Sequence, residues 1–256
     1  MNLLTSTRLG LLVPPENPTA EPEFNALLGD RFGVYATRFP VTPDVRLREM
    51  LNIYNRVLPD VLASFGNLRL EAAVVACSAS HYLLRPGGDR AVCDEMSERA
   101  GYPVQSCTQA ILWALERLGV SSLALVSPYE PWLTETSAGF WSQAGLRVEG
   151  VVSVPATPEG LYDPYQVTTD ALIGEVRKAP MPKSIPLLFT GTGMGTLSAM
   201  TEIAAEGNER IVLSSNLASA WWALRFANQP SVRGGHPLIA RLERQAVDRV
   251  GTAAGL

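Results

Sequence analysis

The chain has 256 residues, a formal net charge of -4 and a hydrophobic content of 46%, enough apolar material for one large or two small α/β domains. Because the net charge is negative rather than strongly positive, we expect neither nucleic acid nor an anionic membrane surface as a partner. No apolar run approaches the roughly 20 residues of a membrane span. The first ten residues also lack the pattern of a signal peptide.

The cysteine and histidine content narrows the chemistry further. The three cysteines, Cys77, Cys93 and Cys107, form an odd number without metal-like spacing, which is typical of free thiols in a reducing compartment. Only two histidines are present, so a histidine-based metal site or a Ser-His-Asp triad is disfavoured. We therefore expect a cytoplasmic protein that binds no metal.

Short apolar strands alternate with helical patterns along the whole chain. Thr19 is expected to cap a helix whose first turn contains Glu21 and Glu23. We predict strands at 8–13, 34–39, 72–76, 122–126, 146–154, 185–189 and 211–213. Helices are predicted from 20, within 44–65 with an interruption at Pro59, and at 91–100, 106–118, 131–144, 167–178, 196–207 and 218–227, with loops at 85–89 and 155–164. Such alternation predicts parallel sheets with right-handed crossovers.

An internal repeat divides this pattern into two halves. The segment LGLLVPP at 9–15 aligns with LALVSPY at 123–129, an offset of 114 residues (123 − 9). The same offset places Cys77 on Gly191, again after an apolar strand and before a loop of small residues. We therefore predict two similar flavodoxin-like α/β lobes related by a pseudo-twofold axis, with the active site in the cleft between them. The expected boundaries are 1–117 plus 213–256 for the first lobe and 118–212 for the second.

The stretch EAAVVACSAS at 71–80 contains the first candidate catalytic residue. Its apolar run is typical of a buried parallel strand, and Cys77 stands where that strand meets a loop. There the N–H groups of a following turn would favour an anion, whereas a buried structural cysteine is the competing interpretation. His81 follows Cys77 by four residues, so one interpretation is a base beside the thiol. The alternative is that His81 supports the site from behind or is exposed at the surface. Cys93 and Cys107 fall on helical patterns and are interpreted as structural.

Other polar segments follow the remaining strands. Asn17 and the segment 127–129 end corresponding strands of the two halves, and each can bring hydrogen-bond donors to the cleft or simply form a turn. The segment TGTGMG at 190–195 has its third glycine misplaced for dinucleotide binding, so a nest for a small carboxylate is favoured. The segment 214–216 is expected to cap a helix, and the tryptophans at 221–222 are expected to pack in the core.

Several of these segments resemble the aspartate/glutamate racemase superfamily, and the closest branch looks like the maleate cis-trans isomerases and arylmalonate decarboxylases. The strings are GLLVPPENPTAEPEF, the strand-Cys-Ser turn at Cys77, PVQSCTQAILWALERLGVSSLALVSPY and VLSSNLASAWWALR. The resemblance implies a cofactor-free site between two lobes, acting on a small dicarboxylate, and leaves a homo-oligomer open. It matches Cys77 to the first family cysteine and implies substrate contacts from Pro14, Asn17, Ser78, Tyr129, Gly191, Thr192 and Gly193.

One departure from the family pattern concerns the second thiol. Family members usually place a cysteine from each lobe beside the substrate, but here the second position is Gly191. Racemisation by two opposed thiols is therefore disfavoured, whereas a decarboxylase needs a single acid. The arylmalonate decarboxylases resemble this arrangement with their one cysteine in the other lobe, so Cys77 would protonate the opposite face of the intermediate.

Three functions remain open at this point. The first is a cofactor-independent decarboxylase of a 2-substituted malonate, with Cys77 as the proton donor and with Ser78, Thr192 and main-chain N–H groups stabilising the enediolate. The second is a maleate-type cis-trans isomerase, with Cys77 as a covalent nucleophile and with Asn17 and Tyr129 holding carboxylates. The third is a carboxylate-binding protein without catalysis.

Overall fold

The computed structural model describes residues 6–157, 162–206, 209–226 and 235–253. Its strands are β1 (Thr7–Val13), β2 (Phe32–Arg38), β3 (Ala72–Val75), β4 (Val104–Ser106), β5 (Ser122–Ser127), β6 (Arg147–Ser153), β7 (Leu187–Phe189) and β8 (Val212–Ser214). Its helices are α1 (Ala20–Leu28), the 3₁₀ turn η1 (Gly29–Arg31), α2 (Leu47–Ala63), α3 (Ser78–Tyr82), α4 (Arg85–Ala100), α5 (Cys107–Arg117), α6 (Pro131–Gln143), α7 (Thr169–Lys178), α8 (Leu197–Ala205), α9 (Ser215–Phe226) and α10 (Pro237–Ala253). The predicted positions 158–161, 207 and 227 lie outside the described residues.

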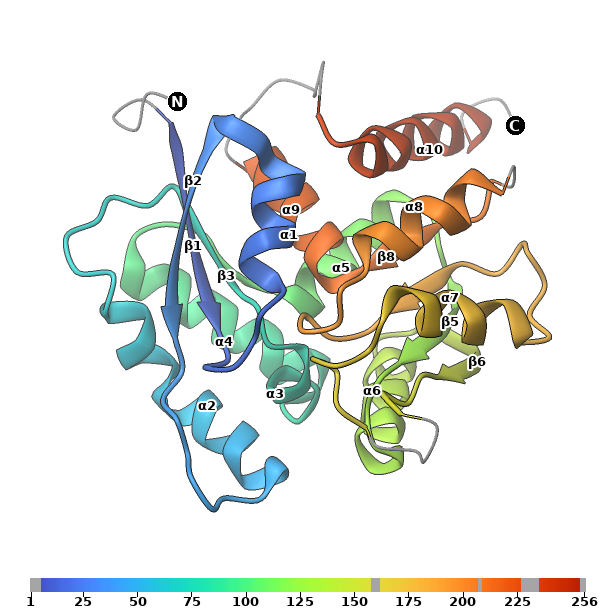
Figure 1. The fold of residues 1–256 in the computed structure, drawn as a ribbon. Coiled ribbons are helices and arrows are strands. Elements are labelled where there is room, and N and C mark those ends of the chain that lie inside the picture. The colour runs from blue at the N-terminus through green and yellow to red at the C-terminus, as the bar shows by residue number, and fades with distance from the viewer. Residues whose placement is uncertain (1–5, 158–161, 207–208, 227–234, 254–256) are drawn as a thin grey trace.

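The strands form two parallel four-stranded sheets with the same topology. The first sheet has the order β2-β1-β3-β4 and the second the order β6-β5-β7-β8. Figure 1 shows the two sheets in separate halves of the molecule, with α2 and α4 beside the first and α6 and α7 beside the second. The predicted α/β class with two similar lobes is therefore confirmed.

The registers of the central strands confirm the internal repeat. Leu9 pairs with Ala72 in the first sheet and Ala124 pairs with Leu187 in the second, so both pairs are 63 residues apart (72 − 9 and 187 − 124). Cys77 follows the end of β3 at the same distance as Gly191 follows the end of β7. Because the carboxyl ends of parallel strands carry the loops that bind ligands, this symmetry brings the two loops into corresponding places.

Helices α5 and α9 pack against each other where the halves meet, and they begin in the same way. The Ser106 hydroxyl accepts a hydrogen bond from the Gln109 N–H at 3.0 Å, and the Ser214 hydroxyl accepts one from the Leu217 N–H at 3.2 Å. Each serine therefore satisfies one of the free N–H groups of a helix N-terminus. This agrees with the predicted capping role of the segment 214–216.

The predicted loop at 85–89 is wrong, because α4 begins at Arg85 and runs through it. Pro86 lies in the first turn of this helix, where a missing N–H costs nothing, and Arg85 itself has φ of 61°. The helix is favoured because it carries Asp89 into the interior, where its carboxylate accepts hydrogen bonds from neighbouring elements. The Pro-Gly-Gly sequence indicated a turn only because this buried interaction is not local.

Two further differences concern helices. The predicted interruption at Pro59 does not occur, since α2 continues to Ala63 with Pro59 inside it. Helix α10 has no counterpart among the predicted elements, although Leu238, Ile239 and Leu242 bury one of its faces. It packs on α9 and covers the end of the molecule near α8 in Figure 1.

Both sheets form the centre of one continuous apolar core, in which all four residues of β3 are buried. This burial on both faces explains why β3 reads as an uninterrupted apolar run. Within the described ranges, no helix is long and apolar enough to cross a membrane.

Replacing Trp221 on α9 tests the packing between α5 and α9. Its ring is fully buried and meets Trp113 on α5 edge-on at 5.0 Å between centroids, while its Nε1 donates to Glu243 at 2.6 Å. Trp221→Ala is expected to lower the free energy of unfolding by about 3–5 kcal/mol, measured by urea denaturation. The control Trp221→Phe keeps an aromatic ring and is expected to cost less; a loss below about 1 kcal/mol for the alanine variant would contradict this role for the pair.

Candidate active site

Cys77 ends the buried segment that follows β3 and lies directly before α3. Its side chain is 4% exposed and lines a cavity of about 340 Å³. Burial raises the pKa of the Cys77 thiol, and hydrogen bonds from Ser80 and from the N–H of Ala79 offset only part of this rise. The thiol is therefore protonated at neutral pH.

The cavity lies between segments of both halves of the chain. The first half supplies the loop after β1, the approach to α2 and the start of α3, and the second half supplies the loop after β5, the segment 162–165 and the loop after β7. Among the described residues of this lining, Glu16 and Glu130 are the charged ones. The apolar part consists of Pro14, Pro15, Val41, Pro43, Leu47, Met50, Leu51, Ala79, Pro128, Leu133 and Pro164.

The lining contains most of the predicted site residues. Cys77, Pro14, Ser78, Tyr129, Thr192 and Gly193 all border the cavity. Asn17 and Gly191 lie behind the lining rather than in it. In the described part of the chain, no three His, Cys, Asp or Glu side chains gather as metal ligands would.

Three tyrosines gather around the thiol. Burial raises the pKa of Tyr54 to about 12, with smaller contributions from nearby Cys77 and Glu16, and burial raises the pKa of Tyr129 and Tyr165 as well. All three phenols are therefore neutral and can donate hydrogen bonds to an anion in the cavity.

Tyr54 and Tyr165 were missed in the sequence. Tyr54 falls on the apolar face of α2 and stacks on Phe39 at 4.7 Å between ring centroids, so its pattern is that of a core residue. Tyr165 follows a segment rich in proline and glycine, and its ring lies against Gly193, where an added Cβ would be 2.3 Å from Cε1. At neither position does the neighbouring sequence distinguish a tyrosine that lines a site from one that packs in the core.

Tyr129 occupies the space that a side chain at position 191 would need. Gly191 has φ of +88°, and a Cβ added there would lie 2.6 Å from the Tyr129 hydroxyl oxygen. A cysteine at 191 would therefore require both a strained backbone and the displacement of this phenol. The loop after β7 thus presents a glycine here, and the loop after β5 presents the Tyr129 hydroxyl.

The Thr192 hydroxyl connects the two strand ends. It donates to the main-chain oxygen of Ala76 at 2.7 Å and accepts from Asn17 Nδ2 at 3.0 Å. Its proton is directed at Ala76, so hydrogen bonding from this hydroxyl to a substrate would require that contact to break. Thr192 therefore holds the loop after β7 directly behind Cys77.

Thr19 stands at the N-cap position of α1, as predicted, but Asn17 supplies the capping hydrogen bonds. Asn17 Oδ1 accepts from the N–H groups of Thr19 and Ala20 at 2.9 and 3.0 Å. The Thr19 hydroxyl makes no capping bond and instead donates to the Gly193 oxygen at 2.6 Å. Both side chains thus connect the loop after β1 to the loop after β7, a long-range use that a local capping pattern does not indicate.

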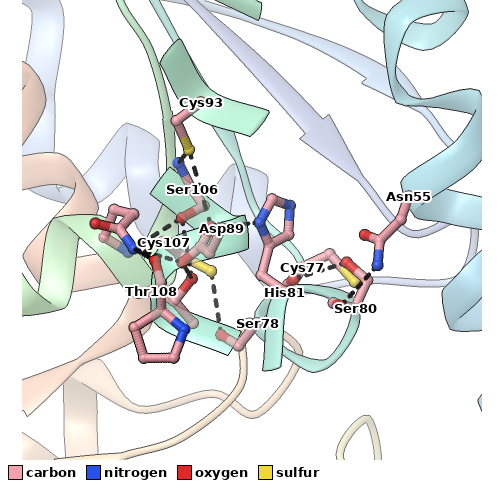
Figure 2. A network of polar contacts seen from close by, with 12 residues as sticks. Asn55, Cys77, Ser78, Ser80, His81, Asp89, Cys93, Ser106, Cys107 and Thr108 are labelled. Atoms are coloured by element: carbon pink, nitrogen blue, oxygen red, sulfur yellow. Dashed lines mark hydrogen bonds and ion pairs between the residues drawn. The ribbon is translucent and has the colours of Figure 1, made fainter. Parts of the chain in front are cut away.

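A buried polar network supports the Cys77 side of the cavity (Figure 2). The Ser78 hydroxyl contacts Cys107 Sγ at 3.1 Å and the Ser215 hydroxyl at 3.0 Å, so it is directed into this network. Cys93 and Cys107 are both buried, and Cys93 Sγ accepts from the Ser106 N–H at 3.2 Å. These contacts fit the structural interpretation of the two cysteines.

Asp89 is the centre of this network. Its carboxylate accepts from His81 Nδ1 at 2.6 Å, from the Thr108 hydroxyl at 2.6 Å and from Gln109 Nε2 at 3.0 Å. Burial alone would raise the pKa of Asp89, but His81 and these hydrogen bonds lower it below its ordinary value. His81 does not line the cavity, so its position is a supporting one.

Replacing Gly191 tests whether the Tyr129 phenol lies directly against this glycine. Gly191→Ala is expected to lower the free energy of unfolding by about 1–3 kcal/mol, because positive φ strains alanine and the new methyl meets the phenol. Adding Tyr129→Phe removes the hydroxyl oxygen and should recover the steric part of this loss, measured as a double-mutant cycle in urea. Equal stability of Gly191→Ala and the unaltered protein would contradict the geometry.

Comparison with known proteins places this geometry in a family. A family model described as arylmalonate decarboxylase matches residues 9–239, and the arylmalonate decarboxylase of Bordetella bronchiseptica is 28% identical over 179 residues, or 68% of this chain and 73% of that protein. The maleate isomerase Iso of Pseudomonas putida S16 with maleate superposes with a TM-score of 0.80 at 21% identity, covering 92% of this chain and 98% of that one. A crystal structure of arylmalonate decarboxylase gives 0.74 at 22% identity, covering 91% and 96%. The chain therefore belongs to the arylmalonate decarboxylase family of the Asp/Glu racemase superfamily, and it shares its two-lobed fold with the maleate isomerases.

Proposed function

We propose that this protein is a cofactor-independent decarboxylase of a malonate that carries an apolar substituent at C2. The observation that carries this proposal is the apolar wall of the cavity, formed on one side by Val41, Leu47, Met50 and Leu51. Maleate is small and carries a carboxylate at both ends, so it has no group to fill such a wall. A 2-substituted malonate places its substituent there.

The charge of the lining supports the same chemistry. Within the described ranges no lysine or arginine borders the cavity, and the charged groups that do so are the carboxylates of Glu16 and Glu130. A substrate carboxylate held against the other apolar residues of the lining, such as Ala79 and Leu133, has lost water without gaining a cation, and losing CO₂ relieves this unfavourable state. The carboxylate that remains can be held by the neutral phenols of Tyr54, Tyr129 and Tyr165.

Cys77 then supplies the proton. When the C–C bond to the departing carboxylate breaks, its electron pair moves to the α-carbon and forms an enediolate. The Cys77 S–H gives its proton to that carbon, and the resulting thiolate is reprotonated from solvent. The products are CO₂ and the monoacid, and no redox partner is needed. A raised thiol pKa is suited to this step, because the group must carry its proton when the intermediate forms.

The cis-trans isomerase is the second candidate, supported by the similarity to a maleate isomerase with maleate. In that reaction Cys77 would add to the double bond as a thiolate, and burial of the thiol opposes its ionisation. The carboxylate-binding protein without catalysis is the third candidate. Measuring turnover of a substituted malonate and of maleate distinguishes the three candidate functions.

Phenylmalonate and maleate are the discriminating substrates. We expect CO₂ and phenylacetate from the first and no fumarate from the second, by gas evolution and by proton NMR. Cys77→Ala is expected to lower the decarboxylation rate by about 10²–10⁴-fold, whereas Cys93→Ser, a buried thiol outside the cavity, should keep it. Fumarate formation without CO₂ would favour the isomerase, and no turnover of either would favour a binding protein.

The pH dependence of kcat separates a thiol from a thiolate mechanism. Because burial raises the pKa of Cys77 above the ordinary 9.0, decarboxylation is expected to stay constant from neutral pH to about pH 9 and to decline only above it. A nucleophilic thiolate would instead make the rate increase with pH over the same range. Such an increase, measured with buffers of constant ionic strength, would overturn the role of Cys77 as proton donor.

A further inference from the structure

Glu23 belongs to α1 but acts on the other half of the molecule. Glu23 is 7% exposed, and its Oε1 accepts from the N–H groups of Thr196 and Leu197 at 2.5 and 3.0 Å. The Thr196 hydroxyl lies 3.2 Å from both oxygens. A carboxylate from the first half of the chain therefore accepts hydrogen bonds from the free N–H groups at the start of α8, which belongs to the second half.

The same carboxylate reaches the active-site loop through one further residue. Asn216 Nδ2 donates to Glu23 Oε2 at 2.8 Å and to the main-chain oxygen of Thr192 at 3.1 Å. Asn216 is 1% exposed, and its Oδ1 has no hydrogen-bond partner in the described residues, so its amide is oriented by these two bonds. Thr192 and Gly193 line the cavity beside Cys77. Glu23 thus holds both ends of the segment 192–197.

Keeping a charge at this place is costly. Burial raises the pKa of Glu23, and hydrogen bonds from Asn216, Thr196 and Leu197 lower it only in part. Its partners Thr196, Leu197 and Asn216 are neutral, and among the described residues no lysine, arginine or histidine forms an ion pair with it. A neutral amide would fill the space at a smaller desolvation cost.

We propose that Glu23 is a positioning residue for the reaction, which holds the Thr192–Gly193 segment against the Cys77 strand end through Asn216 and the start of α8. The inference rests on the proposed function in one respect only, since it assumes that this segment contacts the reacting substrate. Its geometric part, that Glu23 fixes the segment, is independent of the substrate.

Glu23→Gln changes one oxygen to an NH₂ group while keeping the size. The new NH₂ group faces Asn216 Nδ2, which is also a donor, so the Asn216 amide must turn and present its oxygen to position 23. In that orientation the Asn216 oxygen also faces the main-chain oxygen of Thr192, and the two oxygens repel each other. We expect kcat to fall by about 10- to 100-fold, because a displaced segment misplaces the groups around the transition state. A purely structural defect would lower the melting temperature and leave kcat of the folded fraction unchanged.

The double variant Glu23→Gln/Asn216→Asp separates these two roles. It keeps one carboxylate and one amide in the same space, and the bond between positions 23 and 216 forms without a turned amide, because either oxygen of Asp accepts from Gln. It nevertheless places a carboxylate against the Thr192 oxygen. We expect the melting temperature to recover in part while kcat stays low. Recovery of kcat together with stability would overturn the proposal. Glu202→Gln, a surface carboxylate on α8, is the matched control and should change neither quantity.

Hydrogen exchange provides a readout that needs no substrate. Because the N–H groups of Thr196 and Leu197 are bonded directly to Glu23, a peptide covering 190–198 is expected to exchange about 10-fold faster in Glu23→Gln than in the unaltered protein or Glu202→Gln. Unchanged exchange overturns the proposal even if the enzyme is active. If the unaltered protein turns over no substrate, the proposed function fails, and exchange alone decides the role of Glu23.

Discussion

The hydrogen bond from the Thr192 hydroxyl to the Ala76 oxygen is the contact on which the site depends. Ala76 precedes Cys77 at the end of the first lobe's β3, and Thr192 follows the end of the second lobe's β7. In a parallel sheet each of these ends is a separate ligand-binding edge. The bond joins the two edges, so the groups that surround a substrate come from both halves of the chain but are held as one unit.

Two buried carboxylates support this junction in different ways. Asp89 has His81 as a partner, so the pKa of Asp89 is lowered and its charge stabilises the network behind Cys77. Glu23 has only neutral partners, and burial raises its pKa. The charge of the first carboxylate is therefore stabilised by its partners, whereas the second keeps its place at an energetic cost. Costs of this kind are expected where geometry serves a site rather than stability.

The sequence predicted the features that depend on local patterns. The apolar run before Cys77, the strand-helix alternation and the repeat that equates Cys77 with Gly191 are all local or periodic, and they led to the correct fold class and to the cavity. Contacts between distant residues could not be predicted in the same way. Asn17 was expected to hold a carboxylate of the substrate, yet its amide bonds Thr192 and the start of α1. The residues next to Asn17 in the sequence do not indicate that its amide donates a hydrogen bond to a residue 175 positions away.

The same limit explains why the sequence did not indicate α4 at 85–89 or the roles of Tyr54 and Tyr165. The Pro-Gly-Gly sequence before Asp89 indicates a turn until the buried partners of Asp89 are known, and Tyr54 resembles any aromatic residue on the apolar face of a helix. The tyrosines around Cys77 come from separate segments that only the folded chain brings together. Their positions depend on the packing of one lobe on the other, which no window of the sequence contains.

The path of the chain has a consequence for how the molecule is made. Helix α9 follows the last strand of the second sheet, yet it packs against α5 and α1 of the first half, and the Ser78–Ser215 contact spans 137 residues. During synthesis the face of Trp113 that meets Trp221 stays uncovered until nearly the whole chain has emerged. Contacts that close such long loops form slowly, and intermediates with uncovered apolar faces are prone to aggregate. The first half of the chain, although translated first, therefore completes its packing only after α9 has emerged.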